Sequence, residues 1–134
     1  MIQSLFQIVS NECIARNTYK MVLSGDVSSI NRPGQFVNIK LKGFFLRRPI
    51  SVCDIDRNEN TLTIVYKVVG KGTEFMSRLP MNEQLDVLAG LGNGYDTSLC
   101  GEHPLLIGGG AGVPPMFLLA KQLISEGKIP MVIA

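Results

Sequence analysis

The stretch "TLTIVYKVV", residues 61–69, carries the clearest structural pattern in the chain. Its large apolar and aromatic side chains occupy every second position: Leu62, Ile64, Tyr66 and Val68. The positions between them hold Thr61, Thr63, Val65 and Lys67. A period of two indicates a β-strand with one face in a core and the other face at the surface.

Similar segments on both sides extend this pattern to a whole domain. They are rich in Val, Ile, Leu, Phe and Thr and span residues 4–10, 12–25, 35–41, 49–56 and 84–90. Turn-forming pairs such as Gly25-Asp26 and Pro33-Gly34 separate them. Six short strands at this spacing are typical of an antiparallel barrel or sandwich. We therefore expect a mainly β domain over residues 1–100.

After residue 100 the chain changes character. The pattern predicts an apolar strand at 104–108, a helix at about 113–126 and a second apolar strand at 129–133, with a glycine loop before the helix. This is one βαβ unit, whereas a doubly wound sheet needs several parallel strands. We therefore expect residues 101–134 to be the incomplete start of a second, α/β domain.

The expected helix has its own sequence signals. Four of its apolar residues fall at helical spacing: Val113, Phe117, Ala120 and Ile124. Pro114 and Pro115 suit the first turn, where a missing N–H costs little, and Gly127 suits the C-terminal cap. The sequence therefore predicts where this helix begins and ends.

Composition narrows the class of protein. Of the 134 residues, 46% are hydrophobic and 18% charged, as in a globular chain, and the net charge of +2 gives no sign of a nucleic-acid-binding surface. No secretion signal or membrane-spanning helix is predicted, so we expect a cytoplasmic protein. Cys13, Cys53 and Cys100 are widely spaced and fit neither a disulfide framework nor a CxxC metal site.

Three stretches are candidates for chemistry. In "FFLRRPISVC", residues 44–53, an arginine at the start of a strand could grip a diphosphate, or the arginine pair could simply be a surface feature. In "VVGKGTEFMSRLP", residues 68–80, we expect a helix at 73–79 with Thr73 as its N-cap and Pro80 as its stop. Its start could receive a phosphate, or be only a connection.

The third candidate is the glycine loop. A run of Gly108, Gly109, Gly110 and Gly112 lies between an apolar strand and a helix, where backbone N–H groups can approach a phosphate closely. The spacing is not the GxGxxG of a Rossmann fingerprint, and no GK[ST] follows. Dinucleotide binding and a merely tight turn both remain open on this stretch alone.

Taken together, the motifs resemble the ferredoxin-reductase superfamily. They occur in the order "RRPISV" at 47–52, "VYKVVGKGT" at 65–73, "LDVLAGLGNGYD" at 85–96 and "LLIGGGAGVPPMFLLAKQL" at 105–123, and "RPGQFV" at 32–37 also fits. The closest resemblance is to the electron-transfer subunits of two-component, NAD-dependent dihydroorotate dehydrogenases. It covers essentially the whole chain and implies a six-stranded antiparallel FAD-binding barrel, followed by the first βαβ unit of an NAD-binding domain.

The resemblance also implies roles for individual residues. Arg48 would pair with the FAD pyrophosphate, and Ser51 would lie near flavin N5, the atom that accepts hydride, as the candidate catalytic residue. The remaining implied FAD contacts are Pro49, Ile50, Val65, Tyr66, Lys67, Gly72 and Thr73. The implied NAD contacts are Gly108, Gly109, Gly110, Gly112, Val113 and Pro114. Arg47 could be a solvated neighbour or meet a partner subunit.

The implied reaction carries electrons from NADH through FAD and a [2Fe-2S] cluster to an FMN-containing dihydroorotate dehydrogenase catalytic subunit, in a heterotetramer that serves pyrimidine biosynthesis. In the family the cluster cysteines lie beyond the position of residue 134. We therefore expect this chain to hold FAD but not, by itself, to bind NAD well or to relay electrons through iron–sulfur.

Two alternatives remain at this stage. One is a reductase subunit of a sulfide dehydrogenase, a hydrogenase or a ferredoxin:NADP oxidoreductase. The other is a cofactor-free β-barrel that serves as an interaction module.

Overall fold

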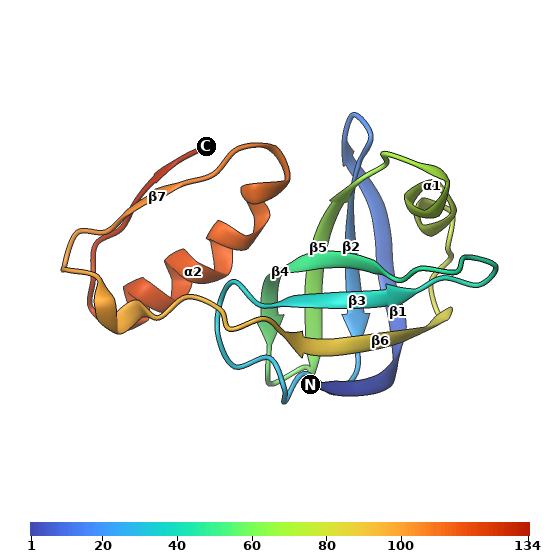
Figure 1. The fold of residues 1–134 in the computed structure, drawn as a ribbon, viewed down its shortest axis with the longest axis horizontal. Helices are drawn as coiled ribbons and strands as arrows, with labels where there is room; N and C mark the ends of the chain where they lie inside the picture. The colour runs from blue at the N-terminus through green and yellow to red at the C-terminus, as the bar shows by residue number, and fades with distance from the viewer.

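The computed structural model describes all 134 residues and contains a closed barrel of six strands (Figure 1). The strands are β1 (Ile2–Ala15), β2 (Thr18–Ser24), β3 (Phe36–Lys40), β4 (Arg48–Asp56), β5 (Thr61–Lys67) and β6 (Gln84–Leu91). They follow the order β1-β2-β5-β4-β3-β6, every pair is antiparallel, and β6 closes the barrel on β1. The predicted six-stranded antiparallel barrel is confirmed.

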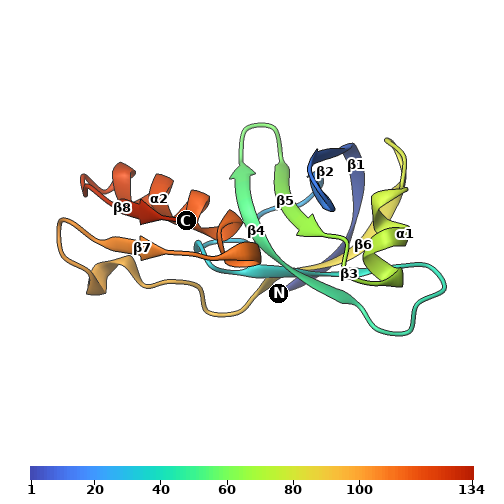
Figure 2. The same ribbon diagram turned by 90° about the horizontal axis from the view of Figure 1, so that it is seen from above.

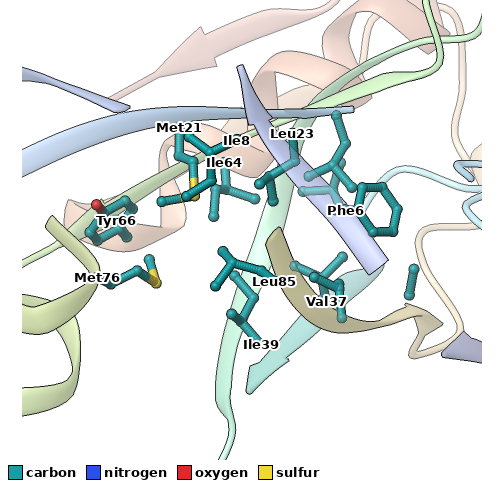
Figure 3. Packing of buried hydrophobic residues seen from close by; sticks show 14 of the residues in the cluster. Phe6, Ile8, Met21, Leu23, Val37, Ile39, Ile64, Tyr66, Met76 and Leu85 are labelled. Carbon is teal, nitrogen blue, oxygen red and sulfur yellow. The ribbon is translucent and has the colours of Figure 1, made fainter. Parts of the chain in front are cut away.

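One hydrophobic core fills the barrel. Seventeen buried residues form it, with Phe6, Met21 and Ile39 among those fully enclosed (Figure 3). On β5, Leu62 and Ile64 are buried as the alternation predicts, because successive side chains of a strand point to opposite faces. The helix α1 (Lys71–Ser77) closes one end of the barrel with Met76.

The first two strands differ from the prediction. The expected break near residue 11 is wrong, because β1 runs on to Ala15 and the turn lies at Arg16 and Asn17. Asn17 has a φ of 53°, a left-handed conformation that asparagine tolerates well. Asn11 lies inside β1, where its side-chain amide donates to the carbonyls of Met76 and Leu79. Asn11 therefore joins β1 to the end of α1.

A smaller unit follows the barrel. It consists of β7 (Leu105–Ile107), a 3-10 turn at Gly110–Gly112, α2 (Pro114–Ser125) and β8 (Met131–Ile133), and another 3-10 turn at Thr97–Leu99 precedes it. The strands β7 and β8 pair in parallel, so the predicted βαβ unit is confirmed. Figures 1 and 2 show this unit at one side of the barrel, and α2 contacts β4.

The buried side of α2 differs from the expected one. Met116, Leu119 and Leu123 pack beneath β7, whereas Phe117 and Ile124 are more than half exposed. Both sets of residues satisfy helical spacing, so only packing against the sheet selects between them.

The end of α2 follows the prediction. Gly127 has a φ of 81°, its N–H donates to the carbonyl of Ile124, and the N–H of Lys128 donates to the carbonyl of Leu123. These two bonds form a Schellman motif, which favours glycine at this position. No helix in the structure is long and apolar enough to cross a membrane.

Candidate functional site

A cleft of about 420 Å³ lies between two barrel strands, the loop that leads into α1, and the start of α2. Its walls are Arg48, Pro49, Ile50 and Ser51 of β4, Val65, Tyr66 and Lys67 of β5, Val69, Thr73, Ala111 and Pro114. The structure thus brings together every residue expected at the flavin except Gly72, which lies directly behind Arg48. We call this space the β4–β5 cleft.

The β4 strand divides its side chains between the core and the cleft. Val52 is fully buried and Ile50 packs partly against the core, so Pro49 and Ser51 fall on the opposite, outer face. Proline donates no ladder hydrogen bond and fixes φ. The result is a rigid strand start that presents a hydroxyl beside an apolar ring.

Arg48 is held at the mouth of the cleft. Its guanidinium lies 5.3 Å from the centre of the Phe44 ring, and it donates to the carbonyl of Leu46. A Cβ built on Gly72 would come within 2.4 Å of the Arg48 guanidinium, so the absence of a side chain at Gly72 leaves the space that Arg48 uses. No carboxylate lies within ion-pair distance of Arg48 or of Lys67, so the cleft carries two uncompensated positive charges.

Arg47 has a different role from its neighbour. It forms an ion pair with Asp86 at 3.0 Å and donates to the carbonyls of Asn38 and Asp86, both at 3.2 Å. Partial burial of Asp86 opposes ionisation, but hydrogen bonds from Arg47 and Gln3 outweigh it and lower the pKa of the carboxyl. Arg47 therefore joins β3 to β6 and does not reach the cleft.

The sequence suggested Thr73 as the N-cap of α1, and this prediction is wrong. The N-cap is Gly70, and Thr73 occupies the third helical position. Its hydroxyl accepts from the N–H groups of Val69 and Gly70, at 2.9 and 3.2 Å, and lies 3.1 Å from the carbonyl of Gly70, to which it donates. The hydroxyl thus holds the loop in shape, and the backbone N–H of Thr73 is the group more available to a ligand.

Tyr66 contributes its backbone and not its ring to the cleft. The ring belongs to the barrel core (Figure 3). The phenol donates to Oδ1 of Asn11 at 2.8 Å. Burial raises the pKa of this phenol. The side chain of Tyr66 is therefore structural, whereas its neighbours Val65 and Lys67 point away from the core.

The glycine loop meets the cleft only at its end. Pro114 and Ala111 line the cleft, and Gly110 borders a small space of about 40 Å³ beside Lys67. The other expected NAD contacts, Gly108, Gly109, Gly112 and Val113, line neither space. A Cβ on Gly108 would lie 2.9 Å from the carbonyl oxygen of Gly112, so part of the glycine run serves the tight turn itself.

Two cleft residues were missed by the sequence analysis. Val69 follows the end of β5, and Ala111 interrupts the glycine run. Neither residue has a chemical signature of its own. The position of Ala111 inside the glycine run was the one signal available.

The cysteines do not form a metal site within this chain. All three are free thiols, and nowhere do three or more metal-ligating side chains gather. Burial raises the pKa of the Cys53 thiol.

Comparisons with known proteins give the family context. No family model matches the chain. Two curated relatives carry the name dihydroorotate dehydrogenase B (NAD(+)), electron transfer subunit. The relative from Fusobacterium nucleatum subsp. nucleatum is 48% identical over 126 residues, and that from Geobacillus sp. (strain WCH70) is 44% identical over 135 residues. The chain is a homologue of these electron transfer subunits.

The match covers most of this chain and about half of each relative. The match with the Fusobacterium subunit spans 90% of this chain and 49% of that subunit. The match with the Geobacillus subunit spans 96% of this chain and 52% of that subunit. The resemblance inferred from the motifs is therefore confirmed at the level of sequence.

Solved structures agree on the fold. The structure of an NADH-dependent reduced ferredoxin-NADP oxidoreductase is 32% identical, with a TM-score of 0.83, and the match covers 96% of this chain and 46% of that one. A phthalate dioxygenase reductase is 22% identical with a TM-score of 0.80, over 97% of this chain and 42% of the other, and supports the fold alone. The barrel is of the ferredoxin-reductase type.

Proposed function

We propose that this chain is the flavin-binding part of a dihydroorotate dehydrogenase electron transfer subunit and that it holds FAD in the β4–β5 cleft. The observation that carries this proposal is the convergence of Arg48, Lys67 and the outer face of β4 on one cleft, in a homologue of such subunits. The proposed division of the chain is a barrel over residues 1–100 and the start of an NAD-binding domain over 101–134.

The residues of the cleft match the chemistry of FAD. Arg48 can donate two parallel hydrogen bonds to a pyrophosphate, and its charge is not used by any carboxylate. Pro49, Ile50 and Val65 offer an apolar wall for a flat ring system. Ser51 offers that ring a hydroxyl from the same strand. Charged and apolar halves of one cleft are what a dinucleotide with a large aromatic ring requires.

The bound FAD would supply two-electron chemistry towards NADH and one-electron chemistry towards an acceptor. The protein's part is to position and shield it. Pro114 and the glycine run are the proposed contacts of NADH, since Pro114 borders the cleft and Gly110 borders the small space beside Lys67. In the whole protein, the proposed acceptors are a [2Fe-2S] cluster and then the FMN-containing dihydroorotate dehydrogenase catalytic subunit, in a heterotetramer that oxidises dihydroorotate to orotate.

A second candidate function has its own support. The structure of the NADH-dependent reduced ferredoxin-NADP oxidoreductase matches at 32% identity, so a reductase subunit of that kind uses the same barrel. The higher identity of the dihydroorotate dehydrogenase relatives, 48% and 44%, favours the first candidate. Identification of the subunit that co-purifies with the native protein separates the two.

Equilibrium dialysis against FAD tests the cofactor itself. We expect the purified chain to take up FAD and to show flavin absorbance, because the cleft joins charge and apolar surface at the required places. The absorption spectrum and the amount of protein-bound flavin are the measurements. A colourless chain that takes up no FAD would favour an interaction module and contradict the proposal.

A further inference from the structure

A second groove lies where the β2–β3 loop, the end of β4 and the second half of α2 meet. It comprises a hollow of about 250 Å³ and a connected one of about 220 Å³, which share Asn31, Arg32 and Gln122. Arg57 and Lys121 also line the larger hollow. We call these five residues the basic groove. It shares no residue with the β4–β5 cleft.

The basic groove is polar and carries excess positive charge. Only two of the nine residues that line the larger hollow are hydrophobic, so an apolar ligand has little to gain there. The charge of Lys121 is balanced by Asp54, at 2.8 Å. Neither Arg32 nor Arg57 has a carboxylate within ion-pair distance. Asp96 lines the smaller hollow and its charge interacts with that of Arg32, but positive charge still exceeds negative charge in the groove, which favours an anionic ligand.

The carboxylates near the basic groove accept hydrogen bonds from neighbouring residues. Asp96 lines the smaller hollow, but its Oδ1 accepts from the N–H and the hydroxyl of Ser98, at 3.1 and 2.6 Å. Glu126 accepts from Thr97 and from Gln122, at 2.8 and 2.7 Å. These hydrogen bonds leave neither carboxylate in an ion pair with Arg32 or Arg57, although Asp96 keeps its negative charge and interacts with Arg32 over a longer distance.

The loop that carries Arg32 is held in place before any ligand arrives. Gln35 is the buried polar residue of the chain, and its Oε1 accepts from the N–H groups of Asn31 and Arg32, at 2.9 and 3.1 Å. Its amide donates to the carbonyl of Gly92 at 3.0 Å. Arg57 donates to the carbonyl of Ile30 in the same loop, at 2.6 Å. A pre-organised site loses less entropy on binding.

We propose that the basic groove binds a phosphate group, either as free orthophosphate or as the phosphate of a nucleotide. The planar forks of Arg32 and Arg57 match the oxygens of a phosphate, and the side-chain amide of Asn31 adds a neutral donor. Lys121 reaches the groove from α2, whereas both arginines come from the barrel. A bound phosphate therefore bridges the barrel and the βαβ unit.

Isothermal titration at constant ionic strength tests this site. Orthophosphate, AMP and adenosine are titrated separately into the chain, and into Arg32→Gln/Arg57→Gln. We expect the double variant to bind phosphate at least about tenfold more weakly, since it loses the charge-assisted hydrogen bonds of both guanidinium groups. Tighter binding of AMP than of orthophosphate identifies a nucleotide ligand, and equal binding identifies the free anion; adenosine alone is expected not to bind.

A matched variant makes the test specific. Arg16→Gln removes an exposed charge from the β1–β2 turn at the other end of the barrel (Figure 1). It is expected to bind phosphate as the unchanged chain does. The double variant reports on the basic groove alone, because neither Arg32 nor Arg57 lines the β4–β5 cleft. No phosphate binding, an unchanged affinity in the double variant, or an equal loss in Arg16→Gln would each overturn the proposal. Failure of the FAD proposal leaves this result unaffected, because the sites share no residue.

Discussion

Arg47 and Arg48 are adjacent in the sequence but lie in different environments. Arg47 is tied to Asp86 and to two carbonyls of neighbouring strands, whereas Arg48 has no carboxylate partner and lies at the mouth of the β4–β5 cleft. Arg47 precedes β4 and its side chain extends to β3 and β6, whereas Arg48 is the first residue of β4 and its side chain lies beside Phe44 and Gly72. Substitutions at the two positions should therefore affect different properties.

We expect Arg48→Ala to weaken FAD binding about tenfold to a hundredfold, since a charge-assisted contact with a diphosphate is typically worth about 1.5–3 kcal/mol. The dissociation constant from flavin fluorescence quenching is the measurement. Arg47→Ala serves as the matched control and should lower stability with little change in FAD affinity. An unchanged FAD affinity in Arg48→Ala contradicts the assignment.

Gly72→Ala tests the position of the Arg48 guanidinium, because Gly72 lies against it. The new Cβ would meet the Arg48 guanidinium at 2.4 Å and displace it, so FAD affinity should fall. Stability should stay level or rise slightly, because alanine favours a helix by up to about 1 kcal/mol over glycine. FAD binding and urea unfolding measured together separate the two effects. Gly70→Ala is the control, because a Cβ at Gly70 meets no atom within 4 Å, and it should leave FAD affinity unchanged. Equal FAD affinity in Gly72→Ala and Gly70→Ala would contradict the role of Gly72.

At the scale of elements, a small polar cluster joins three strands of the barrel. Asp86 on β6 pairs with Leu5 of β1 and Lys40 of β3 in the ladders, and its carboxylate accepts from Arg47 and Gln3. The cluster lies on the outer face of the barrel, so its contribution to stability is small beside that of the hydrophobic core.

This cluster predicts a pH dependence of stability. The folded pKa of Asp86 is lowered, so its contribution is present above the ordinary carboxyl pKa of about 3.9 and is lost as the pH falls through the lower folded value. We expect Asp86→Asn to lower the free energy of unfolding by about 0.5–1 kcal/mol at pH 7 and by less at pH 3. Urea unfolding at both pH values checks this, with Glu12→Gln as an exposed control. A difference that grows at pH 3 has the wrong sign for this explanation.

At the scale of the whole molecule, both binding regions lie where α2 meets the barrel. The first residue of α2, Pro114, borders the β4–β5 cleft, and Lys121 borders the basic groove. The ion pair between Lys121 and Asp54 joins the helix to β4 at 2.8 Å. The placement of α2 against β4 therefore helps to shape two separate spaces, each lined by residues of both units.

One face of the two-stranded parallel sheet is exposed. Leu105 and Ile107 of β7 lie opposite Met131 and Ile133 of β8, and all four side chains are half exposed or more. Alternation puts them on one face of the two-stranded sheet, while Leu106 is buried towards α2. The packing of α2 therefore covers one face of this two-stranded sheet and leaves the other face exposed.

The sequence by itself predicted β5 from "TLTIVYKVV" and the end of α2 from Gly127, because side-chain alternation and helix-cap chemistry are local. The residues of the β4–β5 cleft were expected from the resemblance to ferredoxin reductases and not from a local pattern. Only the tertiary structure decided which face of α2 is buried and that the amide of Asn11 reaches the carbonyls of Met76 and Leu79. Those outcomes depend on which distant surface each residue meets, and neither spacing nor propensity encodes that partner.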